Sequence, residues 1–209
     1  YLSVVVPILN NPIMSLIFSS FILWIFTFLN MAGVKKAGII QAFITVFKIL
    51  FFTLFIIVAF MNFDSSNIFP LFPEGKGVSS IPMAATSTLW AFVGLESSTI
   101  TAGEIKNPEK NIKKSTIYGL LIAAAIYMAI SISSMGAMSN INLQNSTAPL
   151  TEILTNALGN NIGKILTSSG VICIIGTIIG WILSTARVSY AAGIDGVFPK
   201  FFGKVKKMG

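Results

Sequence analysis

The stretch LWAFVGLESSTITAGE, residues 89–104, begins as apolar sequence suited to a membrane and then places an acid beside a run of hydroxyl side chains. A carboxylate at membrane depth is costly, so Glu96 is expected to have a partner or a function. In one continuous helix, Glu96 would point about 120° away from Trp90, which would scatter the functional groups. Gly94 and the hydroxyl residues after it can cap or compete with backbone hydrogen bonds, so the helix could instead be interrupted here. A whole helix, with Gly94 allowing close packing and Glu96 bonded to a neighbouring helix, is equally consistent with these residues alone.

The composition indicates an all-α membrane protein. Of the 209 residues, 54% are apolar and only 10% are charged. Apolar runs of roughly 20 residues recur, the length at which a helix crosses the hydrocarbon layer, and helices satisfy their own backbone hydrogen bonds there. The sequence has no His and a single Cys, which argues against zinc, haem and Cys/His catalytic sites. We therefore expect no enzyme activity, cofactor or metal, and we expect Cys173 to be a small buried apolar residue.

Five candidate spans divide the chain, and because five is odd, the two ends are expected on opposite sides of the membrane. The basic residues cluster at the ends of the apolar runs and do not form one patch of the kind that binds nucleic acid. By the positive-inside rule the lysine-rich connections are cytoplasmic, which places the N-terminus outside and the C-terminus inside. The spans are residues 12–30, 39–60, 81–103, 116–138 and 163–186, and the basic clusters are Lys35 and Lys36, then Lys106, Lys110, Lys113 and Lys114, then Arg187, Lys200, Lys204, Lys206 and Lys207.

The external connection 139–162 carries apolar residues at helical spacing, followed by a glycine in a capping position. We expect a short amphipathic helix that packs on the bundle or rests in the membrane interface. Its apolar positions are Leu150, Ile153, Leu154, Ala157 and Leu158, and the glycine is Gly159.

Lys48 lies close to the middle of the second span, on one helical stripe with Gln41 and Thr45. An intramembrane lysine costs about 2.5–3.5 kcal/mol even on the lenient insertion scale. Both interfaces are too distant for its side chain to reach. We expect it to face the protein interior, and a functional role is favoured over a purely structural partner.

Gly176 and Gly180 in the last span form a small-xxx-small pair, which most often marks close helix contact. The next residue, Trp181, lies well inside the span. It could face a cavity and stack on a cationic substrate, although packing in the core is the simpler expectation.

Three stretches resemble transporters of the amino acid–polyamine–organocation (APC) superfamily. LWAFVGLESSTITAGEIKNPEKNIKKSTIYG, residues 89–119, resembles the family's sixth span and the cytoplasmic loop after it. LNMAGVKKAGIIQAFITVFK, residues 29–48, resembles the entry into the fifth span, and GWILSTARVSYAAGIDGVFPKFFGKV, residues 180–205, resembles the end of the eighth. The similarity is collinear through nearly the whole chain and is greatest to the basic amino acid/polyamine antiporters, typified by the arginine/agmatine antiporter.

The resemblance implies a partial inverted-repeat fold in which residues 1–209 are a single transmembrane piece, matching the end of span 3 through span 8, of a larger transporter. In this family the sixth helix is unwound at the midplane, which implies a discontinuity near Gly94. Family positions that bind substrate match Trp90, Val93, Gly94, Ser97, Ser98 and Trp181, and those for gating and proton coupling match Glu96 and Lys48. Proton-coupled relatives use a lysine like Lys48 in place of a sodium ion, whereas the arginine/agmatine antiporter lacks it, so antiport and proton-coupled uptake both stay open.

We therefore predict secondary active transport of amino acids, of basic amino acids or polyamines in particular, by a truncated middle portion of a multi-pass inner-membrane protein. The expected partners are the substrate, the lipid bilayer and the missing helices supplied as another chain. The alternative is a non-transporting membrane interaction segment or an inactive remnant of a transporter.

Overall fold

The computed structural model describes residues 6–31, 34–72, 75, 77–94, 99 and 105–204, with residues 34–37 described by their backbone alone. The described residues form helices and no strands, which confirms the all-α prediction. In chain order the elements are η1 (Pro7–Asn10), α2 (Pro12–Met31), α3 (Val34–Met61), η2 (Ser65–Asn67), η3 (Gly77–Ser80), α4 (Ile81–Leu89), η4 (Trp90–Phe92), α6 (Pro108–Ala137), α7 (Asn140–Asn145), α8 (Pro149–Leu158), α9 (Asn160–Ile194) and η6 (Lys200–Gly203).

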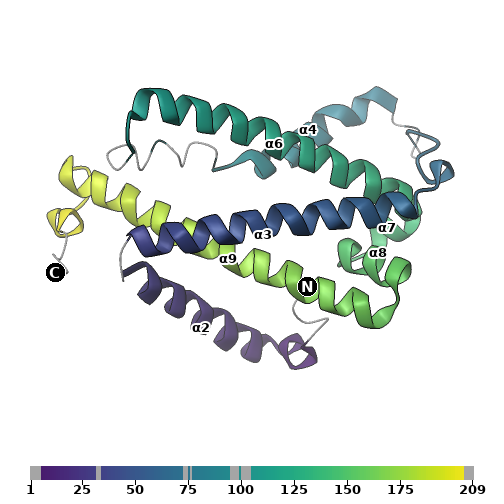
Figure 1. The fold of residues 1–209 in the computed structure, drawn as a ribbon, viewed down its shortest axis with the longest axis horizontal. Coiled ribbons are helices and arrows are strands. Elements are labelled where there is room, and N and C mark those ends of the chain that lie inside the picture. The colour runs from purple at the N-terminus through teal and green to yellow at the C-terminus, as the bar shows by residue number, and fades with distance from the viewer. Residues whose placement is uncertain are drawn as a thin grey trace.

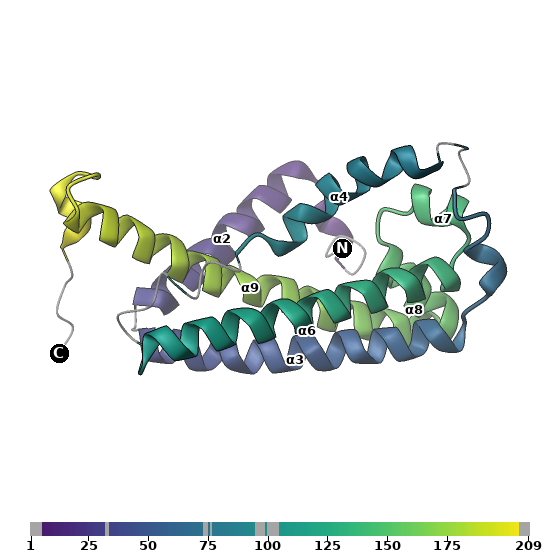
Figure 2. The ribbon, with the colours of Figure 1, turned by 90° about the horizontal axis from the view of Figure 1, so that it is seen from above.

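Within the described residues, four helices are long and apolar enough to cross a membrane: α2, α3 from Gly38, α6 and α9. They run alongside one another, with α3 packed against both α6 and α9, and α2 packed against α9 (Figures 1 and 2). Helix α2 ends, α3 and α6 begin, and α9 ends at the same end of this bundle. The four helices therefore follow the up-and-down order that the five-span prediction requires.

Two helices extend beyond the predicted spans, because apolar length marks the hydrocarbon crossing and not the whole helix. Helix α6 begins at Pro108, not at residue 116, because proline suits the first helical turn and the following lysines are good helix formers in water. Helix α9 runs over Asn160–Ile194, beyond the predicted 163–186 at both ends. Both helices thus extend past the expected membrane-embedded part.

The third predicted span is interrupted at the expected place. Helix α4 has nine residues and ends at Leu89, a single 3-10 turn follows, Val93 is extended with ψ 132°, and Gly94 has φ +103°. A helix of that length is roughly 14 Å long and cannot cross a hydrocarbon layer of about 30 Å. The discontinuity near Gly94 is confirmed, and an uninterrupted helix over 81–103 is wrong. The residues that would continue this span, 95–98 and 100–104, lie outside the described part of the chain.

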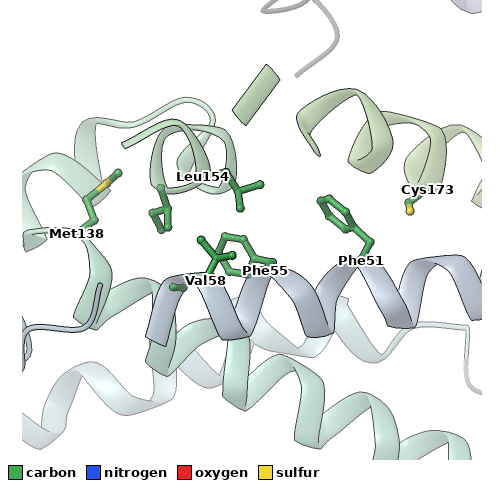
Figure 3. Packing of buried hydrophobic residues seen from close by; sticks show 8 residues of the cluster. Phe51, Phe55, Val58, Met138, Leu154 and Cys173 are labelled. Carbon is green, nitrogen blue, oxygen red and sulfur yellow. The ribbon is translucent and has the colours of Figure 1, made fainter. Parts of the chain in front are cut away.

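The most buried apolar cluster lies where α3, α8 and α9 meet (Figure 3). Phe55 and Leu154 are each 1% exposed, and Cys173 is 2% exposed. The amphipathic helix predicted in connection 139–162 is thus confirmed as α8, packed on the bundle through Leu154 and its neighbours. Cys173 is confirmed as a buried small residue with a free thiol.

Three glycines of α9 allow α3 to approach closely. A Cβ placed on Gly176 would lie 2.5 Å from Ile44 Cγ2, and one on Gly180 would lie 3.2 Å from Gln41 Nε2. Gly170 meets the Phe51 ring in the same way, at 2.9 Å. The paired positions are 41 with 180, 44 with 176 and 51 with 170, so residue numbers increase along α3 as they decrease along α9. The two helices are therefore antiparallel. The close contact predicted from Gly176 and Gly180 is confirmed.

At the far end of α3, the chain is tied to the end of α6. The backbone N–H of Asp64 donates to the carbonyl of Gly136 at 2.9 Å, and Asn67 Nδ2 donates to the same oxygen at 2.8 Å. The Phe63 ring occupies the space that a Cβ on Gly136 would need. We name this contact, made by residues 63–67 and Gly136, the α3–α6 clasp.

The carboxylate of Asp64 caps η2, and its hydrogen bonds set its acidity. Hydrogen bonds from the Ser66 hydroxyl and, second, from the Ser66 N–H at 2.8 Å hold the pKa of the Asp64 carboxyl below its ordinary value. Since the folded pKa is lowered, the cap is fully present above the unfolded value of about 3.9 and is lost as the pH falls through the lower folded value. We expect the Ser66 amide resonance to titrate with a midpoint below about 3.9, and the titration to vanish in Asp64→Asn. A midpoint at or above the unfolded value would contradict the cap.

Candidate functional site

The intramembrane lysine lines a cavity of about 320 Å³ between α3, α6, α8 and α9. Lys48 lies near the middle of α3, as predicted, and is half-buried there. The rest of the wall combines apolar side chains with four hydroxyls. The lining residues are Lys48, Phe51, Phe52, Tyr127, Leu150, Thr151, Leu154, Thr167, Gly170, Val171, Cys173, Ile174 and Thr177.

The cavity wall carries one basic side chain and no acidic one among the described residues. Two of its hydroxyls donate to their own helix. Thr167 Oγ1 donates to the carbonyl of Gly163 at 2.8 Å, and Thr177 Oγ1 lies 2.5 Å from the carbonyl of Ile174 and 3.3 Å from that of Cys173. A hydroxyl whose hydrogen is used in this way can only accept from the cavity side. The ammonium of Lys48 is thus the charged donor of this space, facing acceptor oxygens, which suits a carboxylate, water or an exchangeable proton.

The interrupted segment reaches this cavity through one aromatic contact. The Phe92 ring, two residues before Gly94, meets the Tyr127 ring edge-on at 5.5 Å between centroids and 71° between planes. Tyr127 also lines the Lys48 cavity. Sequence reasoning missed Tyr127, whose only signal is a hydroxyl-bearing ring inside an apolar run. Tyr127 contacts the ring of Phe92 and also lines the cavity, whereas neither Trp90 nor Val93 lines it.

The predicted substrate-binding residues are distributed over two regions. Trp90 opens η4 and is 78% exposed, and Val93 and Gly94 form the break itself. Trp181 lies on α9 one turn beyond Thr177 and is 52% exposed. Neither tryptophan lines the Lys48 cavity.

The remaining predicted site residues, Glu96, Ser97 and Ser98, lie outside the described residues. The role of each of the eight predicted residues stays a prediction.

The structure thus contains a discontinuous helix, a mid-helix lysine and a cavity lined with hydroxyls. Comparison of the sequence with known protein families gives a match over the full chain. A sequence model of the amino acid permease family matches residues 1–209. The chain belongs to the amino acid permease family. The superfamily resemblance drawn from three short stretches is thereby confirmed.

The curated relatives of this permease chain are named as transporters. It is 34% identical over 198 residues to the "Putative arginine/ornithine antiporter" of Bacillus subtilis, covering 90% of this chain and 42% of that protein. It is 33% identical over 205 residues to the putrescine transporter PotE of Haemophilus influenzae, covering 93% of this chain and 45% of the relative. PotE of Escherichia coli K12 is 29% identical over 196 residues, covering 90% of this chain and 43% of the relative. The permease chain thus spans less than half the length of the curated relatives it matches.

Proposed function

We propose that this chain is part of a secondary active transporter that moves basic amino acids or polyamines across the inner membrane. The observation that carries the proposal is the interruption at Val93–Gly94, which Phe92 joins through Tyr127 to the Lys48 cavity. A broken helix leaves peptide N–H and C=O groups without helical partners at membrane depth, which is tolerated around a cavity or a bound solute. Secondary transporters bind substrate at such discontinuities.

In this proposal the break holds the polar head of the substrate and the tryptophans hold its side chain. The polar head is proposed to lie at the segment from Gly94 to Ser98, as substrate does at helix breaks in secondary transporters; residues 95–98 lie outside the described part of the chain. Trp90 and Trp181 present exposed indole faces, and each can stack on a cationic side chain for about 0.5–2 kcal/mol. Alternating access then moves the filled site from one side of the membrane to the other. The relatives named for arginine, ornithine and putrescine support a cationic substrate.

Lys48 and Glu96 are proposed to couple protons to this movement. A lysine half-buried in a cavity whose described lining residues include no acid can gain and lose a proton as the site opens and closes. Exchange of one substrate for another remains the second possible mode, supported by the antiporter named among the relatives. The concentration of lysines at one end of the bundle supports a cytoplasmic C-terminus and an external N-terminus.

The test measures uptake of radiolabelled arginine, lysine, ornithine and putrescine into membrane vesicles. The vesicles come from cells that express the chain as its native coding sequence encodes it. The substrate would be identified as the compound whose labelled form is taken up saturably and whose unlabelled form competes best with that uptake. Uptake unaffected by both Trp90→Ala and Glu96→Gln would overturn the site assignment. If no vesicle preparation transports any of the four, the alternative of a non-transporting interaction segment is favoured.

For Lys48 we expect proton-driven uptake to fall at least about tenfold in Lys48→Gln, equivalent to about 1.4 kcal/mol. Glutamine is one atom shorter than lysine and keeps a hydrogen-bonding end group, but it cannot carry the proton. Exchange between internal and external substrate, which needs no net proton movement, should fall less. Lys164→Gln, at an exposed lysine on the same protein, is the matched control. Equal loss in uptake and in exchange would assign Lys48 a structural role.

A further inference from the structure

The charged side chains are distributed unequally between the two ends of the bundle. At the end where α6 begins and α9 ends, the described residues include seven basic side chains and two acidic ones. At the opposite end they include two acids, Asp64 and Glu152, and one base, Lys164. We name the first surface the basic end, made by Lys106, Lys110, Lys113, Lys114, Arg187, Lys200 and Lys204 with Glu109 and Asp195.

The first turns of α6 place the lysines directly beside exposed apolar side chains. Lys110, Lys114, Tyr118 and Leu121 follow one another at spacings of four, four and three residues, so they share one face of the helix. Tyr118 is 61% exposed and Leu121 is 60% exposed, and both lysines are exposed. Along this face the side chains change from charged to aromatic to aliphatic. A membrane helix shows the same order where it passes from the headgroups into the acyl chains.

The segment after α9 repeats this combination in a compact form. The positive φ of Gly196, +76°, turns the chain back, and the N–H groups of Val197 and Phe198 both donate to the carbonyl of Ala192, at 3.0 and 2.9 Å. Backbone then packs on backbone, because a Cβ on Gly193 would overlap the nitrogen of Gly203.

The turn at Gly196 brings together three phenylalanine rings close to Lys200 and Lys204. The rings of Phe201 and Phe202 lie 4.3 Å apart, and that of Phe198 lies 5.5 Å from Phe202. Phe201 remains 64% exposed, and Lys200 and Lys204 flank it with exposed side chains. We name residues 197–204 the phenylalanine wedge. Exposed aromatic rings that alternate with lysines at a helix end are suited to the boundary between headgroups and acyl chains.

We propose that the basic end and the phenylalanine wedge form a binding surface for anionic phospholipid headgroups. The surface has an excess of positive charge, which complements a headgroup phosphate that carries no compensating amine. The exposed rings of the wedge and the apolar stripe of α6 complement the acyl chains below. A basic residue close to an anionic membrane surface contributes about 1 kcal/mol, roughly fivefold in affinity. The proposal concerns a different surface from the Lys48 cavity and holds whether or not the chain transports.

The test uses the full chain, purified in a nonionic detergent and titrated with phosphatidylglycerol or phosphatidylcholine of identical acyl chains, with retained lipid counted by native mass spectrometry. We expect phosphatidylglycerol to be retained at least about tenfold more strongly, and the preference to shrink at high salt. Lys110→Gln/Lys114→Gln and Lys200→Gln/Lys204→Gln should each lower the preference by about tenfold or more. Lys164→Gln should leave it unchanged. Equal retention of the two lipids, or displacement of phosphatidylglycerol by millimolar inorganic phosphate, would overturn the proposal.

A second measurement distinguishes lipid from protein at the wedge. A nitroxide on Val197→Cys, in a Cys173→Ala background reconstituted into phosphatidylglycerol-containing bilayers, should collide with both oxygen and a nickel chelate, as expected at headgroup depth. A label shielded from both reagents would show that a protein segment covers the wedge and would overturn the lipid assignment.

Discussion

Gly94→Ala should reduce transport by up to about 150-fold. Gly94 has φ +103°, a backbone conformation that residues with a Cβ rarely adopt. Holding a non-glycine residue there costs about 1–3 kcal/mol, and alanine also favours continuation of the helix. The equilibrium ratio of the broken conformation to a continuous helix therefore falls by about fivefold to 150-fold. If substrate is held at the break, uptake falls by up to that factor.

Two measurements check this expectation. Uptake of the preferred substrate is compared with hydrogen exchange of the amides of residues 91–94, which should slow in the variant as the segment becomes helical. Gly119→Ala is the matched control because Gly119 lies within α6 with nothing within 4 Å of an added Cβ. Unchanged uptake together with slowed exchange would separate the break from transport and remove the main support for the proposed mechanism.

Gly176→Leu should be the most destabilising of the substitutions considered. A Cβ at this position lies 2.5 Å from Ile44 Cγ2 and 2.7 Å from Ile44 Cδ1, and the first of these is fixed close to the α3 backbone. The collision is relieved only if α3 and α9 separate. Overpacking of this kind costs about 1–3 kcal/mol, and leucine should lie at the upper end of that range.

The free energy of unfolding, measured by denaturing-detergent titration, should fall by that amount in Gly176→Leu and by less in Gly176→Ala. Gly119→Leu places the same side chain in open space on α6 and should leave the free energy of unfolding almost unchanged. Similar losses at positions 176 and 119 would mean that glycine is needed for its backbone or for lipid contact and not for the α3–α9 approach.

Apolar length and glycine spacing were sufficient to predict most of the fold. Span 12–30 matches α2 within one residue, and 39–60 lies inside α3. Residues 108–115 of α6 lay outside the predicted span because these first two turns are polar and start with Pro108, features that a search for hydrocarbon-crossing segments ignores. The wedge after α9 was missed because its compact form depends on Gly193 meeting Gly203, a tertiary contact that no local pattern encodes.

The candidate site was less accessible from sequence. Lys48 could be identified because an isolated charge in an apolar helix is conspicuous, and the break could be located because Gly94 precedes a cluster of hydroxyl residues. Tyr127 could not, since its importance depends on two neighbours from other segments, Phe92 and the Lys48 cavity. Local chemistry reveals which residues are unusual, whereas the partners of ordinary residues are set by tertiary packing.

The α3–α6 clasp determines which parts of the molecule can change position. Two donors on one carbonyl, with the Phe63 ring closed over Gly136, make α3 and α6 a single stiff frame, to which the glycine contacts add α9. Among the described residues, the contacts of helix α4 are mainly with its own flanking turns, η3 and η4. If the proposed transport holds, we expect rearrangement to be greatest in α4 and smallest in the frame of α3, α6 and α9.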